Sequence, residues 1–531
     1  MSQFYAKPNL IIEPLIMRWY AWSHLVSPAT SSMNIVKRHI EIMNSYIDSP
    51  QQHMDAVKDP KMLGGPFMDY AYNRTDEIKE LLTKTLEKQS KMVQLSFAFR
   101  KLDKLLKSHP KGYSLEDLYQ MVPEILKGYV ELLYDLNNNI SFRVYEELLY
   151  ETEYYDKNFQ SIALWITNND SRPFSLSTPK LDDPNVLHLP ISFDNSIIDE
   201  LARMKRYPGS FDDLSTKLNL NEEQKKLFET FFTTEKPEPY KKYIGDKVRM
   251  RYFGHACIFI ETKDLNILID PLISYYGYPS EVHHFSDYDL PDEIDYVLIT
   301  HNHQDHILFE TLLPLRHRIK NIVVPRSGGG LQDPKLKLMF NKIGFNNVIE
   351  IDEMETIHRN DCKITGLPFT GEHSDLDIRA KTCYHVKVED FSLLFSADSR
   401  VMEPRLYDNI HKIIGDVDVI FLGMECDGAP LSWLYGPLMF EEVSRENDQS
   451  RTLSGCDHKK GIHLVDMFHP KEVYVYAMGQ EPWCEFISSL KYTDESIPIV
   501  ESNKLVDECL SRGLIAERLF GEKEILYNKK K

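Results

Sequence analysis

Three histidines and one aspartate fall within six residues in the sequence HNHQDH. The apolar run 296-YVLIT-300 directly before them is typical of a short buried strand. Because strand residues alternate between two faces, His301 and His303 point the same way if strand geometry continues that far. Asp305 and His306 follow where the chain must leave the sheet. The spacing therefore predicts two ligand pairs, one for each of two metal ions.

Carboxylates at two later strand ends provide further candidate ligands. Glu372 and His373 follow an apolar run through Gly371, and either of them could be the ligand. Asp398 ends the apolar run 391–397, where a carboxylate has no packing role. A buried acid is costly there unless it is solvated or bound to cations. Because one carboxylate can bind two ions, we expect Asp398 to bridge them, and we expect Glu372 and Asp398 to be the acids of the reaction centre.

The last ligand is expected from a helix predicted at residues 456–469. His458 lies four residues before Ile462 on the apolar stripe of this helix and falls in its first turn. We therefore expect His458 to complete the site. His463 points toward a flank of the same helix and is the alternative.

Two regions with different sequence patterns must position these residues. Up to about residue 240 the pattern is mainly helical, with helices predicted at 75–107, 115–136 and 221–233, although Pro123 should break or bend the second of them. The charged, proline-bearing segment 234–247 is expected to be a linker. Beyond it, short apolar strands alternate with turns, and helices are predicted among them at 332–343, 403–413 and 456–469.

This order of elements favours a layered α/β sandwich over a doubly wound parallel sheet. A chain of 531 residues is too long for one ordinary core. We expect two domains, a mainly helical (α+β) domain at 1–240 and a metal-binding α/β domain at 245–531.

Composition excludes some partners. Lys and Arg number 62 against 81 Asp and Glu, a formal charge of −19, which disfavours nucleic acid and membrane surfaces as partners. The sequence has no apolar run of about 18 residues and no signal pattern at its start, so we expect a cytoplasmic protein. Seven widely spaced cysteines suggest neither a disulfide framework nor a cysteine zinc site.

The pattern RYFGHACIFIETKDLNILIDPLIS at 251–274, the HNHQDH cluster and SADS at 396–399 together resemble the metallo-β-lactamase superfamily. That resemblance implies an αββα sandwich. The Gly-His-Ala and Ile-Asp-Pro sequences are most similar to the lactonase and phospholipase D-like branch. The resemblance also implies that Asp270 supports a metal-bound histidine through its other ring nitrogen.

A narrower resemblance rests on two departures from simple members of the fold. Most of these hydrolases carry a histidine where this chain has Gly-Glu-His-Ser-Asp, and they lack a helical N-terminal region of about 240 residues. Both features resemble the diiron β-hydroxylases that act on carrier-protein-bound amino acids in nonribosomal peptide antibiotic biosynthesis, of the chloramphenicol type. In that group a glutamate replaces the histidine, which implies Glu372 as a ligand.

The resemblance implies a non-haem monooxygenase with two iron ions, O2 and external electrons. Its implied partners are a carrier protein bearing an aminoacyl thioester and an electron donor, and it implies a homodimer formed through the N-terminal domain. The first iron would bind His301, His303 and Glu372, and the second Asp305, His306 and His458, with Asp398 between them. A carboxylate in place of an imidazole moves the preference of the site from zinc toward iron.

Two other functions compete with this one. A hydrolase with two zinc ions would attack an ester, lactone or phosphodiester with metal-bound hydroxide, and its ligand would be His373. A non-catalytic interaction protein is disfavoured because no acid or imidazole of the set is missing. The segment 423–437 brings Glu425, Trp433 and Tyr435 near the expected mouth of the site, where the aromatic residues could shape a substrate pocket, with ordinary loop packing as the alternative.

Overall fold

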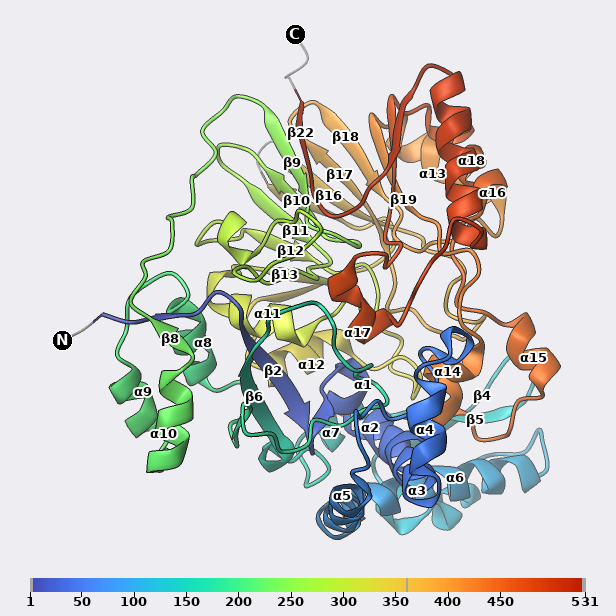
Figure 1. Cartoon of the computed structure of the whole chain (residues 1–531). Helices are drawn as coiled ribbons and strands as arrows, with labels where there is room; N and C mark the ends of the chain where they lie inside the picture. The colour runs from blue at the N-terminus through green and yellow to red at the C-terminus, as the bar shows by residue number, and fades with distance from the viewer. Residues whose placement is uncertain (1–2, 360–361, 528–531) are drawn as a thin grey trace.

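The computed structural model describes residues 3–359 and 362–527. The region after the linker is built on two seven-stranded sheets that face each other (Figure 1). The first sheet has the order β14 (Val348–Ile351), β13 (Ile322–Pro325), β12 (Tyr296–Leu298), β11 (Asn266–Ile269), β10 (Ile258–Glu261), β9 (Val248–Tyr252) and β22 (Lys523–Tyr527). The second has the order β15 (Thr356–Arg359), β16 (Cys362–Leu367), β17 (Cys383–Val388), β18 (Phe391–Phe395), β19 (Val419–Gly423), β20 (Glu472–Tyr476) and β21 (Ile515–Arg518).

Helices cover the outer faces of both sheets. The first sheet is covered by α11 (Phe309–Leu315) and α12 (Leu336–Lys342), and the second by α13 (Pro404–Ile414), α16 (His458–Phe468) and α18 (Ile497–Ser511). Between the sheets, Leu298, Phe395 and Phe421 belong to one buried cluster. Strands buried on both faces have near-continuous apolar sequences, which is why these runs could be recognised. The expected αββα sandwich is confirmed.

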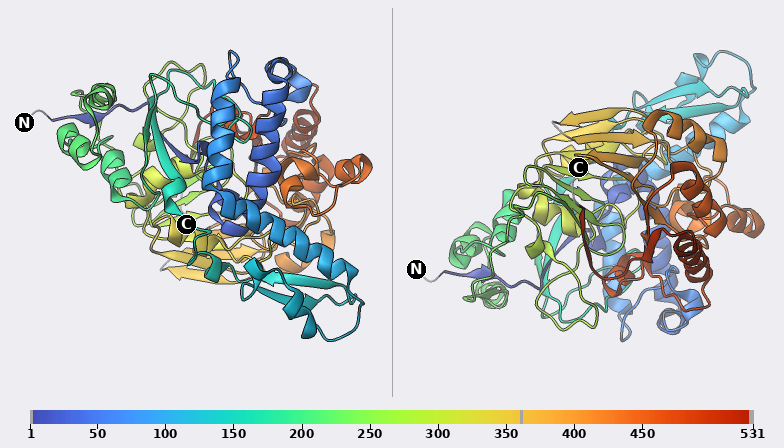
Figure 2. Two further views of the ribbon diagram at one scale, coloured as in Figure 1. Left: turned by 90° about the horizontal axis from the view of Figure 1, so that it is seen from below. Right: turned by 90° about the horizontal axis from the view of Figure 1, so that it is seen from above.

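The N-terminal region, residues 3–237, lies below the sandwich in Figure 1, and the view from below in Figure 2 shows its helices in front of the strands. Its central sheet has the order β3 (Trp19–Tyr20), β2 (Leu10–Ile16), β6 (Gln160–Ile166) and β7 (Leu187–Leu189). Its first helical elements are α1 (Ser23–Val26), α2 (Pro28–Asn34), the π-helix η1 (Ile35–Ile40) and α3 (Glu41–Asp48). The predicted helix 75–107 is present as α5 (Thr75–Lys88) and α6 (Ser90–Ser108). The predicted helix 221–233 is shorter in the structure: α10 (Glu222–Glu229), capped by Asn221, is followed by strand β8 (Phe232–Thr233).

One predicted helix, 115–136, is wrong. The segment forms two short 3-10 turns and then strand β4 (Val130–Tyr134), which pairs with β5 (Ile140–Val144). Pro123 lies between the two turns and interrupts any helix, because it lacks the N–H that a helix interior needs. Gly128 has φ 82, a left-handed conformation that ends helical structure before the strand begins.

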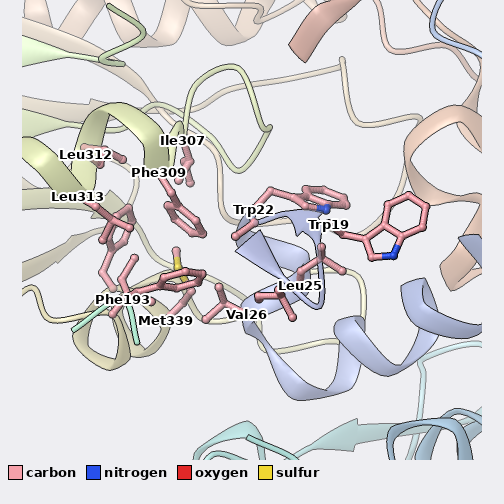
Figure 3. Packing of buried hydrophobic residues seen from close by; sticks show 14 of the residues in the cluster. Trp19, Trp22, Leu25, Val26, Phe193, Ile307, Phe309, Leu312, Leu313 and Met339 are labelled. Atoms are coloured by element: carbon pink, nitrogen blue, oxygen red, sulfur yellow. The ribbon is translucent and has the colours of Figure 1, made fainter. Parts of the chain in front are cut away.

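The N-terminal region and the sandwich share one hydrophobic core. Trp22, which directly precedes α1, and Leu25 of α1 lie in the same buried cluster as Phe193, and Phe309 and Leu312 of α11 belong to it as well (Figure 3). Because α11 begins three residues after His306, this packing helps to hold the end of the HNHQDH loop. Residues 234–247, all of them described, form no helix or strand, and the division into domains at 240–245 stays a prediction. None of the helices in the described part of the chain is long and apolar enough to cross a membrane.

Candidate metal centre

The predicted ligands follow the carboxyl ends of strands from both sheets. HNHQDH follows β12, Glu372 follows β16 and Asp398 follows β18. His301, His303 and Glu372 form a buried group whose ligand atoms all lie within 4.8 Å of one another. Nδ1 of His303 is 2.7 Å from Oε1 of Glu372, and Nε2 of His301 is 3.9 Å from Oε2. The two sheets therefore each contribute side chains to one group.

Asp398 lies between this group and the rest of the cluster. Its Oδ2 atom is 2.9 Å from Nε2 of His306 and 3.6 Å from Nε2 of His301. These three residues form a second group of possible ligands within 4.8 Å. This is the position that a bridging carboxylate would need.

A third group contains a residue that is not among the predicted ligands. His255, Asp305 and His306 also bring their ligand atoms within 4.8 Å, and Nε2 of His255 is 3.4 Å from Oδ2 of Asp305. His255 lies in the turn between β9 and β10. Its signal in the sequence was the Gly-His-Ala motif, which contributed to the fold resemblance but not to the ligand set.

The expectation for His458 is corrected by the structure. Its Nε2 atom is 2.6 Å from Oε2 of Glu508 on α18, and within residues 3–359 and 362–527 it belongs to none of the possible metal-binding groups. The buried face of α16 carries Gly461, Leu464, Val465 and Phe468, so the helix is rotated from the expected phase and turns His458 toward α18. His463 also lies outside the groups found among the described residues.

His373 lies beside the ligand groups rather than in one of them. Its Nδ1 atom is 2.9 Å from Oε2 of Glu372, and its ring stacks on His303 with 4.5 Å between centroids. Between the two alternatives left open by the sequence, the geometry therefore favours Glu372 as the ligand.

Four residues at the site have backbone conformations that non-glycine residues rarely adopt. His255, Asp270, Glu372 and Ala397 have φ angles of 48°, 40°, 64° and 46°. Left-handed conformations at non-glycine residues cost about 1–3 kcal/mol each and persist where the surrounding structure enforces them, typically at functional sites. All four residues lie just after strand ends, at or next to a candidate ligand or its support.

Two further residues support the site from outside the ligand groups. Oδ2 of Asp270 is 2.9 Å from Nδ1 of His306, and its carboxylate also accepts hydrogen bonds from the backbone N–H (2.8 Å) and hydroxyl of Thr300. This is the role that the resemblance implied for Asp270. Gly423 leaves room for the bridging candidate, because a Cβ atom there would lie 2.5 Å from Oδ1 of Asp398.

At Glu372 and His301 the electrostatics favour the protonation states that bind metals. Burial alone would raise the pKa of Glu372, but the rings of His303 and His373 hold it well below its usual value. Burial, together with the neighbouring His306, lowers the pKa of His301 well below its usual value. A carboxylate and a neutral imidazole are the forms that coordinate metal ions.

Unpaired buried atoms show that the residues present fit a pair of metal ions. Nε2 of His301 and Oδ1 of Asp398 are buried and find no hydrogen-bond partner among the described residues. Buried polar atoms are nearly always paired, and these two belong to the groups described above. Imidazole nitrogens combined with carboxylate oxygens suit iron centres that activate oxygen.

Comparisons with known proteins agree with this geometry. A family model described as the diiron non-heme beta-hydroxylase N-terminal domain matches residues 5–237, and a beta-lactamase superfamily domain model matches residues 265–429. The chain is 37% identical over 522 residues, 97% of this chain and 98% of the relative, to the Streptomyces venezuelae 4-amino-L-phenylalanyl-[CmlP-peptidyl-carrier-protein] 3-hydroxylase.

Solved structures give the same result. The crystal structure of CmlA, a diiron beta-hydroxylase from Streptomyces venezuelae, has 37% sequence identity and a TM-score of 0.92, and the match covers 99% of both chains. A mutant form of that enzyme matches with a TM-score of 0.90, covering 98% of this chain and 99% of the other. The likeness thus spans the N-terminal region and the sandwich together. The chain belongs to the diiron non-haem β-hydroxylases, oxygen-dependent monooxygenases that use two iron ions.

Proposed function

We propose that this enzyme hydroxylates the β-carbon of an amino acid that is bound as a thioester to a peptidyl carrier protein. The observation that carries the proposal is Glu372 in one group with His301 and His303, where zinc hydrolases of the fold use a third histidine. The relative from Streptomyces venezuelae, similar over almost the whole chain, is named for a 4-aminophenylalanyl group on a carrier protein.

We assign the ligands on the same grounds. His301, His303 and Glu372 would hold one iron, and Asp398 would bridge to the other. The second iron would be held by Asp305 and His306 with His255, which takes the place first expected for His458. Two irons supplied with O2 and electrons would provide the oxidant for breaking the β C–H bond.

The remaining tasks belong to the side chains of this chain. Asp270 accepts the Nδ1 proton of His306, which leaves Nε2 of that ring free to face Asp398. The carboxylate of Glu372 adds negative charge, which stabilises the oxidised metal pair. His301, His303 and His306 are at most 5% exposed, so bulk water is kept from the ligands.

The proposal includes the partners that such a reaction needs. A carrier protein would deliver the aminoacyl group, an electron donor would supply reducing equivalents, and two copies of the chain would form a dimer in the cytoplasm. The carrier protein has the most support, because the relative is named for a substrate on such a protein.

The test is a turnover assay with 18O2. Iron-loaded enzyme, a chemical reductant and carrier proteins charged with different aromatic amino acids are mixed, and the intact carrier is weighed by mass spectrometry. The proposal predicts a gain of one labelled oxygen atom at the β-carbon. Hydrolysis of an ester or lactone by zinc-loaded enzyme, with no oxygen incorporated by iron-loaded enzyme, would overturn it.

A matched pair of variants separates the two reactions further. Glu372→Ala should abolish oxygen incorporation, whereas His373→Ala should retain iron binding. In a hydrolase that uses His373 as its ligand, His373→Ala would lose the metal and Glu372→Ala would keep it.

A further inference from the structure

Both ring nitrogens of His303 have partners, and the two partners differ in kind. Nδ1 is 2.7 Å from Glu372, inside the proposed ligand group, and Nε2 is 2.8 Å from the hydroxyl of Tyr435. When Nδ1 binds a metal, the only proton of the neutral ring lies on Nε2, which then donates to the Tyr435 hydroxyl. The hydroxyl thus sets the tautomer and the orientation of the ring.

Tyr435 comes from a segment of the sandwich that lies against the N-terminal region. It is the last residue of α14 (Leu431–Tyr435), it is 1% exposed, and its ring centroid lies 6.3 Å from that of His24. Nη2 of Arg38 donates to the carbonyl oxygens of Trp433 at 2.7 Å and Leu434 at 3.1 Å. A guanidinium on these carbonyls fixes the backbone directly before Tyr435.

Two other observations support a link between the N-terminal region and α14. Arg38 lies in η1, a π-helical segment, and π-helical turns are rare and occur often at functional sites. Nε1 of Trp433 donates to the carbonyl oxygen of Gly64 at 2.8 Å, a second link between α14 and the N-terminal region. Residues far apart in the sequence thus hold one tyrosine against one candidate ligand.

We propose that Tyr435 is a positioning residue for the metal ligand His303 and that Arg38 of the N-terminal region holds Tyr435 in place. This inference rests on the proposed ligand role of His303. It gives the N-terminal region a part in the metal centre in addition to its expected roles in dimer formation and carrier-protein docking.

The first experiment removes only the hydroxyl. Tyr435→Phe is compared with Tyr384→Phe, a control in which a buried tyrosine near the same loop loses a hydroxyl that bonds to the carbonyl oxygen of Ile299 and to no candidate ligand. Loss of a side chain that supports a metal ligand typically weakens metal affinity by about 10–100-fold. We expect Tyr435→Phe to release iron to a chelator faster by about this factor and the control to behave as wild type.

A spectroscopic measurement separates positioning from general destabilisation. In Mössbauer spectra of the diferric protein, Tyr435→Phe should change the signal of one iron and leave that of the other. Equal iron release and identical spectra in Tyr435→Phe and wild type would refute the proposal. Should Tyr435→Phe fold poorly, 3-fluorotyrosine at position 435 keeps the packing and alters the hydroxyl, and it should change the same signal.

The second experiment tests the link to the N-terminal region. Arg38→Met is compared with Arg100→Met, because Arg100 contacts the same segment beyond Tyr435, through the carbonyl oxygen of Met439 at 3.5 Å. We expect Arg38→Met to change the signal of the same iron and to add little to Tyr435→Phe in the double variant. Equal changes of the iron signal in the two arginine variants would contradict the link. So would a change in the double variant that equals the sum of the changes in Arg38→Met and Tyr435→Phe.

These readouts do not depend on hydroxylation, so the inference can fail separately from the proposed function. If the protein proves to hold zinc, the same variants are compared as cobalt(II)-loaded protein by optical absorption. A cobalt spectrum altered in Tyr435→Phe but not in Tyr384→Phe would support the role of Tyr435, and an unaltered one would overturn it.

Discussion

A buried ion pair joins the N-terminal region to the helix that follows the ligand loop. Nη1 and Nη2 of Arg172 contact Oε1 and Oε2 of Glu310 on α11 at 2.8 and 2.9 Å. The two side chains are 9% and 2% exposed. The hydroxyl of Tyr275 donates a further hydrogen bond to Glu310 at 2.8 Å. Because α11 begins three residues after His306, this pair also helps to hold the end of the ligand loop.

Replacing Arg172 by methionine keeps much of the side-chain volume and leaves the Glu310 carboxylate buried without its cation. An effective dielectric constant of about 20 gives an attraction of about 6 kcal/mol at this separation. The cost of burying the two charges offsets part of it, and removal of one partner of such a pair typically costs about 3–5 kcal/mol. This is a large share of the stability of a folded protein, which is about 5–15 kcal/mol.

The assay is a double-mutant cycle on the free energy of unfolding, measured by urea titration of wild type, Arg172→Met, Glu310→Gln and the double variant. We expect the double variant to lose at least about 2 kcal/mol less than the sum of the single losses. The control is Lys91→Met, whose partner Glu153 is 57% exposed, with an expected loss of at most about 1 kcal/mol. Additivity within about 0.5 kcal/mol would refute the reasoning.

Three further predictions concern the metal centre. Gly423→Ala places a methyl group 2.5 Å from Oδ1 of Asp398, so iron per chain should fall in elemental analysis, and two irons per chain would contradict the proposed bridge. His255→Ala should lower the iron content and His458→Ala should leave it unchanged; the reverse would restore the ligand first expected from the sequence. Removing metal with a chelator should lower the free energy of unfolding, and Fe(II) at a hundredfold excess over its Kd should restore about 2.7 kcal/mol per site. An equal free energy of unfolding with and without metal would contradict the proposal that these residues bind metal ions.

The parts of the site that could be predicted are those set by local spacing. His301, His303, Asp305 and His306 are close in the chain, so their meeting requires only that the strand ends where its apolar run ends. Asp398 could be predicted because a carboxylate at the end of an apolar strand has few other roles. The strands themselves were recognisable because burial on both faces requires continuous apolar runs.

The parts that were missed depend on packing between distant elements. His458 lies on the predicted helix, but the rotation of α16 is set by Gly461 and its apolar neighbours against the sheet and α18. His255 is a single histidine in a turn with φ 48°, and nothing in its spacing tied it to HNHQDH. In the segment 115–136, the helical pattern was outweighed by Pro123 and by pairing with a strand that had not been predicted. That the two regions share one core could not be predicted, because an apolar face has the same periodicity whichever element covers it.

The most direct test of the central claim is anomalous X-ray diffraction from crystals of iron-loaded enzyme, recorded above and below the iron absorption edge. The account predicts two iron peaks about 3.5–4 Å apart, the usual separation in two-metal sites. Glu372 should contact the first, His255 the second, and Asp398 both. A single peak, a signal only at the zinc edge, or a peak ligated by His373 instead of Glu372 would contradict it.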